Sequence, residues 1–69
     1  MKISARNVLK GKVVKVTNGA VNSEIVIELP SGEQIVSVIT KTSAESLGLK
    51  TGKEAYAIIK ASHVLVAVD

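Results

Sequence analysis

Short, mainly hydrophobic runs separated by polar, turn-forming residues recur along most of the chain. In the second run, Glu24 and Glu28 alternate with the apolar residues Ile25, Ile27 and Leu29, which is typical of a β-strand that exposes one face. The residues in these stretches are mainly Val and Ile, whose branched side chains suit a pleated, half-buried surface. The pattern predicts five short strands, over residues 12–16 (KVVKV), 22–29 (NSEIVIEL), 33–40 (EQIVSVIT), 54–60 (EAYAIIK) and 63–68 (HVLVAV).

Turn-forming sequences separate these strands, and one segment breaks the pattern. The turn signals are Asn-Gly, Pro-Ser-Gly and Thr-Gly, at residues 18–19, 30–32 and 51–52. Between two strands, Thr42 and Glu45 fit a helix capping box and Gly48 fits a C-terminal stop. The segment therefore predicts a helix of one or two turns at about residues 42–47.

The order of these elements predicts the fold class and the domain organisation. With 69 residues, the chain is one domain, residues 1–69, near the lower size limit for independent folding. Short strands with one short helix indicate an all-β protein, a small OB-like five-stranded barrel.

Several predicted strands are apolar on both alternating faces. The segments are residues 25–27, 38–39, 57–59 and 64–68. A small barrel buries only one face of each strand, and soluble monomers rarely expose large apolar patches. Either the alternation assigns some faces wrongly, or an oligomer buries the second face. We favour the oligomer, because so short a chain also needs the extra burial.

Composition and charge restrict the compartment and the ligands. The chain has no cysteine, and its N-terminus lacks the apolar stretch of an export signal. The longest apolar run, residues 64–68, is too short to span a bilayer. We therefore expect a cytoplasmic protein with no membrane partner. A net charge of +3 makes anions the plausible ligands.

Two function classes find little support in the sequence. His63 is the only histidine and Asp69 the only aspartate, so no catalytic or directly coordinating metal cluster stands out and we expect no enzyme. OB folds that bind single-stranded nucleic acid use aromatic stacking platforms, and Tyr56 is the only aromatic residue. A basic OB-fold module for single-stranded nucleic acid remains the alternative, because lysines can hold phosphates.

A site for a small oxyanion fits the sequence better. A tetrahedral dianion needs hydrogen-bond donors and cations, and a carboxylate would repel it. Residues 4–7 (SARN), 40–43 (TKTS) and 60–62 (KAS) each supply such donors and contain no acid. Each stretch alone has a structural explanation, as a strand end, a helix cap or an exposed lysine. The three together favour the oxyanion site.

The same stretches carry a resemblance to a known family. The string Ser-Ala-Arg-Asn-Val-Leu-Lys-Gly at residues 4–11, Ile-Thr-Lys-Thr-Ser at 39–43 and Ile-Lys-Ala-Ser at 59–62 resemble the molbindins, the small molybdenum-pterin-binding (Mop) proteins with a TOBE domain. The resemblance covers the whole chain. It implies an OB-like barrel assembled as a homohexamer, a trimer of dimers. It also implies molybdate or tungstate bound between subunits, for storage or homeostasis of the oxyanion.

The resemblance also implies ligand residues. The matching positions are Ser4 and Arg6, the hydroxyl pair Thr40 and Ser43, Lys60, and the backbone N–H groups of Ala5 and Ala61. Some relatives have serine at the position of Ala61, so one hydroxyl contact is lost here. A second class of site maps only loosely, to Ala20, Val21 and Asn22 in the loop of residues 19–23 and to Ser62 and His63.

Overall fold

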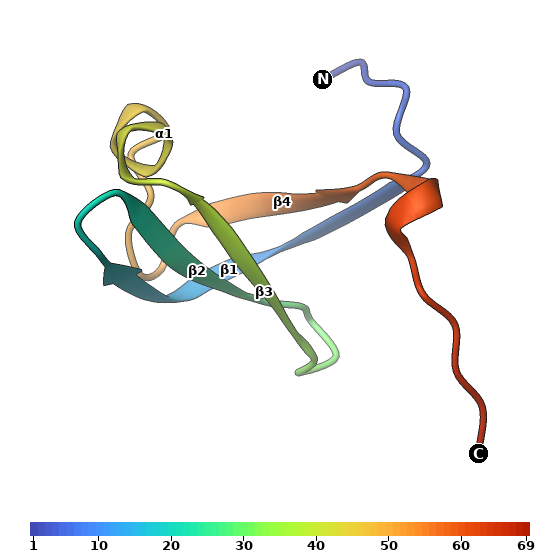
Figure 1. The fold of residues 1–69 in the computed structure, drawn as a ribbon. Coiled ribbons are helices and arrows are strands. Elements are labelled where there is room, and N and C mark those ends of the chain that lie inside the picture. The colour runs from blue at the N-terminus through green and yellow to red at the C-terminus, as the bar shows by residue number, and fades with distance from the viewer.

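The computed structural model describes residues 1–69 as a single four-stranded antiparallel sheet with one short helix (Figure 1). The sheet order is β3-β2-β1-β4. The elements are β1 (Asn7–Asn18), β2 (Asn22–Glu28), β3 (Gln34–Thr40), α1 (Lys41–Ser46), β4 (Glu54–Ile59) and the 3-10 helix η1 (Ala61–His63). Neither helix has the length and apolar character that a membrane-spanning segment needs.

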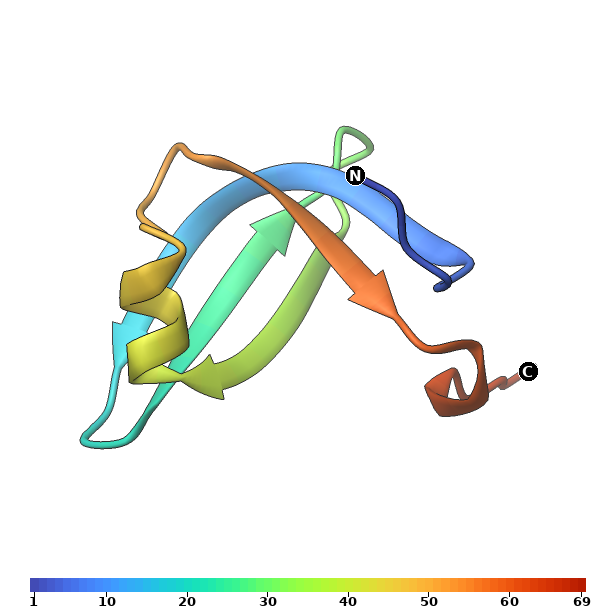
Figure 2. The ribbon, with the colours of Figure 1, turned by 90° about the horizontal axis from the view of Figure 1, so that it is seen from above.

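Strand β1 bends the sheet into a half-barrel. Its first half pairs with β4, from Asn7 opposite Ile59 to Lys12 opposite Glu54, and its second half pairs with β2. A β-bulge between Val13 and Lys15 lies where the strand changes partners, and bulges increase local bending. Figure 2 shows the resulting curve of β1 across the molecule. The sheet does not close, because its two edge strands, β3 and β4, do not pair with each other.

The core lies on the inner face of this curved sheet. Val13, Ile25, Ile27, Ala57 and Ala44 form one buried cluster, in which Ala44 comes from α1 and the others from the sheet. Alternation accounts for the strand residues, because positions two apart on a strand point to the same face. The helix therefore covers one end of the sheet with a single small side chain.

The prediction of a fifth strand over residues 63–68 is wrong for this structure. The chain turns into η1 after β4, where the His63 N–H donates to the Lys60 carbonyl at 2.9 Å. Residues 64–69 then extend away from the sheet (Figure 1), and the Leu65 side chain is 93% exposed. Alternation predicts the face of a strand, but a strand forms only where a neighbour supplies backbone partners.

The other elements agree with the sequence, with two corrections. Strand β1 begins at Asn7 rather than at Lys12. The helix occupies residues 41–46, and its N-cap is Thr40, not Thr42. Gly48 ends it with a positive φ of 63°, as expected for a C-terminal stop. Turns form at all three predicted places, although Gly19 does not adopt positive φ.

The corrected cap leads to a stability prediction. Thr40→Ala should lower the free energy of unfolding by about 1 kcal/mol, because Ser43 loses the oxygen that accepts its N–H. Thr40→Ser should retain most of the stability. Thr42→Ala is the matched control, and urea unfolding of the three variants measures the effect. A larger loss from Thr42→Ala than from Thr40→Ala would contradict the observed cap.

Candidate functional site

Two of the three donor-rich stretches meet at one end of the sheet. The pairing of Asn7 with Ile59 places the residues before β1 beside those after β4. The Asn7 side chain strengthens this junction, since its Nδ2 donates to the Ile59 carbonyl at 3.2 Å. The two segments line one open hollow of about 480 Å³, formed by Ile3, Ser4, Ala5, Arg6, Lys60, Ala61 and Ser62.

The chemistry of this hollow suits an anion. Arg6 and Lys60 supply two cations, Ser4 and Ser62 supply hydroxyls, and no acid is among the lining residues. Neither cation is engaged in an ion pair, because the only salt bridge in the structure joins Lys10 and Glu54. The positive charges are therefore available to a ligand.

The third stretch lies at the opposite end of the sheet. Thr40 ends β3 opposite Asn22, beside the hairpin that joins β1 to β2. In both ribbon views α1 and this hairpin lie at one end of the molecule, and the N-terminal segment and η1 at the other (Figures 1 and 2). A single copy of the chain does not bring Thr40 and Ser43 to the hollow of Arg6 and Lys60.

The two hydroxyls of this third stretch are ordered by the helix cap. The Ser43 N–H donates to Thr40 Oγ1 at 3.0 Å, and the Thr40 hydroxyl donates to Ser43 Oγ at 2.7 Å. Both residues are exposed. Because its oxygen accepts the Thr40 hydrogen, the Ser43 hydroxyl keeps its own hydrogen for a ligand.

The residues proposed for a second class of site are separated in the same way. Ala20, Val21 and Asn22 belong to the β1–β2 hairpin, where the Val21 carbonyl accepts the N–H of Lys41 at 2.8 Å. Ser62 and His63 lie in η1 at the other end of the sheet, and both are exposed. One chain again presents two separate groups of residues.

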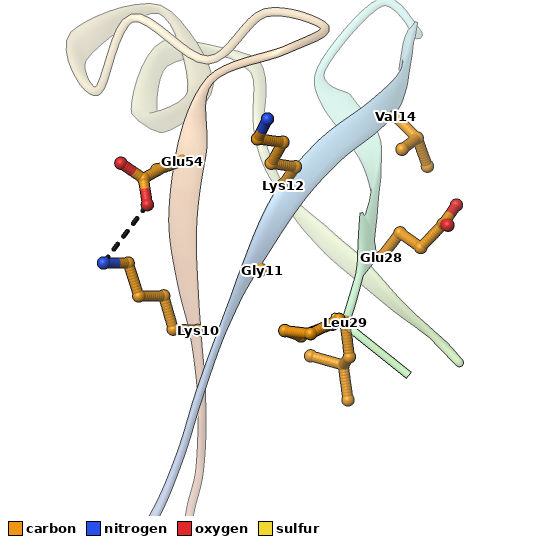
Figure 3. Close-up of a pocket in the computed structure, with 8 residues that line it drawn as sticks. Lys10, Gly11, Lys12, Val14, Glu28, Leu29 and Glu54 are labelled. Atoms are coloured by element: carbon orange, nitrogen blue, oxygen red, sulfur yellow. Dashed lines mark ion pairs between the residues drawn. The ribbon is translucent and has the colours of Figure 1, made fainter. Parts of the chain in front are cut away.

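A second hollow, on the outer face around Gly11, is a poorer anion site (Figure 3). Glu28 and Glu54 both line it, and each would repel a dianion. Lys10 Nζ lies 3.2 Å from Glu54 Oε2, and the hydrogen bond and charge of Glu54 raise the pKa of Lys10. Lys10 is therefore already paired with Glu54, whereas Arg6 and Lys60 form no ion pair.

Sequence reasoning missed one contributor to the site and the partner of another. Ile3 forms part of the hollow, and Asn7, which the sequence offered as an amide donor, ties β1 to β4 beside it. Asn7 stands within the first donor-rich stretch, but the sequence does not show that its partner is the carbonyl of residue 59. The strand register between β1 and β4 supplies that information.

Comparison with known proteins identifies a family and several similar proteins. Residues 3–66 match the TOBE domain family. The chain is 51% identical over its full length to the whole of a probable molybdenum-pterin-binding protein of Haemophilus influenzae. It is 48% identical over 96% of its length to molybdenum-pterin-binding protein 3 of Clostridium pasteurianum, of which it covers 97%.

Solved structures agree with the sequence comparison. MopII of Clostridium pasteurianum superposes with a TM-score of 0.93 and 45% identity, covering 97% of this chain and all of MopII. The cytoplasmic molybdate-binding protein ModG, solved with molybdate bound, gives a TM-score of 0.91 and 46% identity, over 94% of this chain and 46% of ModG. The chain therefore belongs to the TOBE-domain family and, within it, to the molybdenum-pterin-binding (Mop) proteins.

Proposed function

We propose that the chain is a cytoplasmic binding protein for molybdate or tungstate, which it holds as the intact oxyanion for storage or homeostasis. The observation that carries the proposal is the hollow with Arg6 and Lys60, which has two unpaired cations, neutral donors and no acid. The relatives named for molybdenum-pterin binding and the molybdate-bound ModG support the same ligand. Residues 1–69 act as one oxyanion-binding domain.

The sites form between subunits. Ser4, Arg6 and Lys60, with the N–H groups of Ala5 and Ala61, supply one half of each site. The hydroxyl pair of Thr40 and Ser43, from a second copy, supplies the other half. The separation of the two groups at opposite ends of one sheet supports this arrangement, because no single copy assembles them.

Exposed apolar surface supports the oligomer. Residues 64–68 are all exposed, and Val36 and Val38 are more than half exposed on the outer face of β3. A largely apolar groove with Ile35 and Ile59 in its wall separates β3 from β4. In the assembly we propose, the tail of a neighbouring copy enters this gap as a fifth strand, because the two edge strands would offer it backbone partners. We propose a homohexamer, a trimer of dimers.

Titration calorimetry tests the proposed function. Molybdate and tungstate should each bind with saturation, and their stoichiometry should follow the assembly seen by native mass spectrometry. Phosphate should bind more weakly, because it carries a proton near neutral pH and the hollow has no carboxylate to accept that proton. A short single-stranded oligonucleotide is the comparison ligand. Salt-sensitive oligonucleotide binding without molybdate binding would instead favour the nucleic-acid module.

A further inference from the structure

Ser23 is the one buried polar side chain of the protein. It is 0% exposed, whereas the other buried side chains are all apolar. Burying a hydroxyl is costly unless it finds a hydrogen-bond partner. Ser23 Oγ donates to Asn18 Oδ1 at 2.7 Å, so the hydroxyl is satisfied, but by one specific neighbour across the β1–β2 hairpin.

This bond lies at the base of the hairpin that contacts α1. Asn18 and Ser23 form the last pair of the β1–β2 ladder, and the Gly19 N–H closes the tip on the Asn22 carbonyl at 2.7 Å. Within this tip, between Gly19 and Asn22, the Val21 carbonyl accepts the N–H of Lys41, the first residue of α1. The hairpin tip therefore anchors the start of the helix.

The helix depends on such anchors. It has six residues, too few to be stable alone, and only Ala44 buries its side chain. Its N-cap residue Thr40 and Ser43 in its first turn form the hydroxyl pair that is proposed to face the anion. A movement of the hairpin tip shifts Lys41 and, with it, the two hydroxyls beside Lys41.

We propose that Ser23 is a positioning residue for oxyanion binding, because its bond to Asn18 fixes the hairpin that places the Ser43 hydroxyl. The inference rests on the proposed function, and it assigns Ser23 no contact with the ligand. Its full burial keeps the side chain away from any bound anion.

The test is molybdate titration of Ser23→Ala in the full-length assembly. Loss of one hydrogen bond should raise the dissociation constant about two- to tenfold. Thr17→Ala is the matched control, since Thr17 lies exposed in the same β1–β2 ladder and its side chain makes no hydrogen bond. The Lys41 amide should also exchange faster with solvent in Ser23→Ala, and not in Thr17→Ala.

A double variant separates positioning from stability. Ser23→Ala should weaken binding little further when Ser43→Ala is already present, because both act on the same hydroxyl. A lower melting temperature with unchanged molybdate affinity in Ser23→Ala would overturn the inference. Should that variant not fold, Asn18→Ala removes the acceptor at an exposed position and must weaken binding at least as much, because it leaves the Ser23 hydroxyl buried without a partner. Absence of molybdate binding in the wild type would refute the proposed function itself.

Discussion

Leu65→Asp should dissociate the assembly and abolish saturable molybdate binding, although Leu65 makes almost no contact within one subunit. Its side chain is 93% exposed in the single chain, so the substitution should cost an isolated subunit almost nothing. In a neighbour's groove, the same change removes roughly 1.5–3 kcal/mol of apolar burial per subunit. It also buries an unpaired carboxylate, at a cost of several kcal/mol more.

Native mass spectrometry and molybdate titration measure both effects. Thr51→Asp adds the same charge to an exposed turn and should leave the assembly unchanged. Leu65→Ile keeps the apolar side chain and should behave as the wild type does. If Leu65→Asp retains the full assembly, the tail is not the contact between subunits. The groove between β3 and β4 must then be covered by some other segment.

Arg6→Lys should weaken molybdate binding by about 1–3 kcal/mol, the range for hydrogen bonds to charged groups. Lysine keeps the charge but lacks the planar fork that can hold two oxygens at once. Arg6 forms no ion pair and lies in the open hollow, so its loss should not disturb the fold. Calorimetric titration gives the affinity, and thermal unfolding without ligand gives the stability.

Two serine variants give a comparison for the loss of molybdate affinity in Arg6→Lys. Ser4→Ala and Ser43→Ala each remove one neutral donor and should each weaken binding less than Arg6→Lys does. A structural role for Arg6 predicts the reverse pattern, a lower melting temperature with unchanged affinity. Wild-type affinity in Arg6→Lys would show that the arginine is not a bidentate anchor. The site would then depend on Lys60 and the backbone amides.

The central strands of the fold are readable from the sequence because runs rich in Val and Ile lie between clear turn signals. Strands β2 and β3 lie within the predicted ranges, although Val26 is buried on the same face of β2 as the exposed Glu24. The prediction for residues 63–68 fails although their composition favours a strand equally well. No strand of the same chain lies beside them, and a pattern of side chains does not specify a backbone partner.

The candidate site could be read only as separate pieces. Sequence composition singles out the stretches with Arg6, Lys60 and Ser43 because each combines donors without an acid. It does not reveal that the first two share a hollow while the third lies at the far end of the sheet. That division follows from the strand order, in which β1 pairs with β4 at one end and β2 with β3 at the other.

The unpaired cations of the hollow have a consequence for the empty assembly. Each subunit carries a net charge of +3, and in the proposed assembly a second copy would add only the neutral hydroxyls of Thr40 and Ser43 to Arg6 and Lys60, which would stay without a counter-charge. The vacant form of the proposed assembly would therefore be under Coulombic stress, which added salt would relieve by screening. A bound dianion would act as a fixed counterion between the two surfaces. The ligand would then be a structural component of the proposed contact, and the tightness of the assembly would report how much of the oxyanion the protein holds.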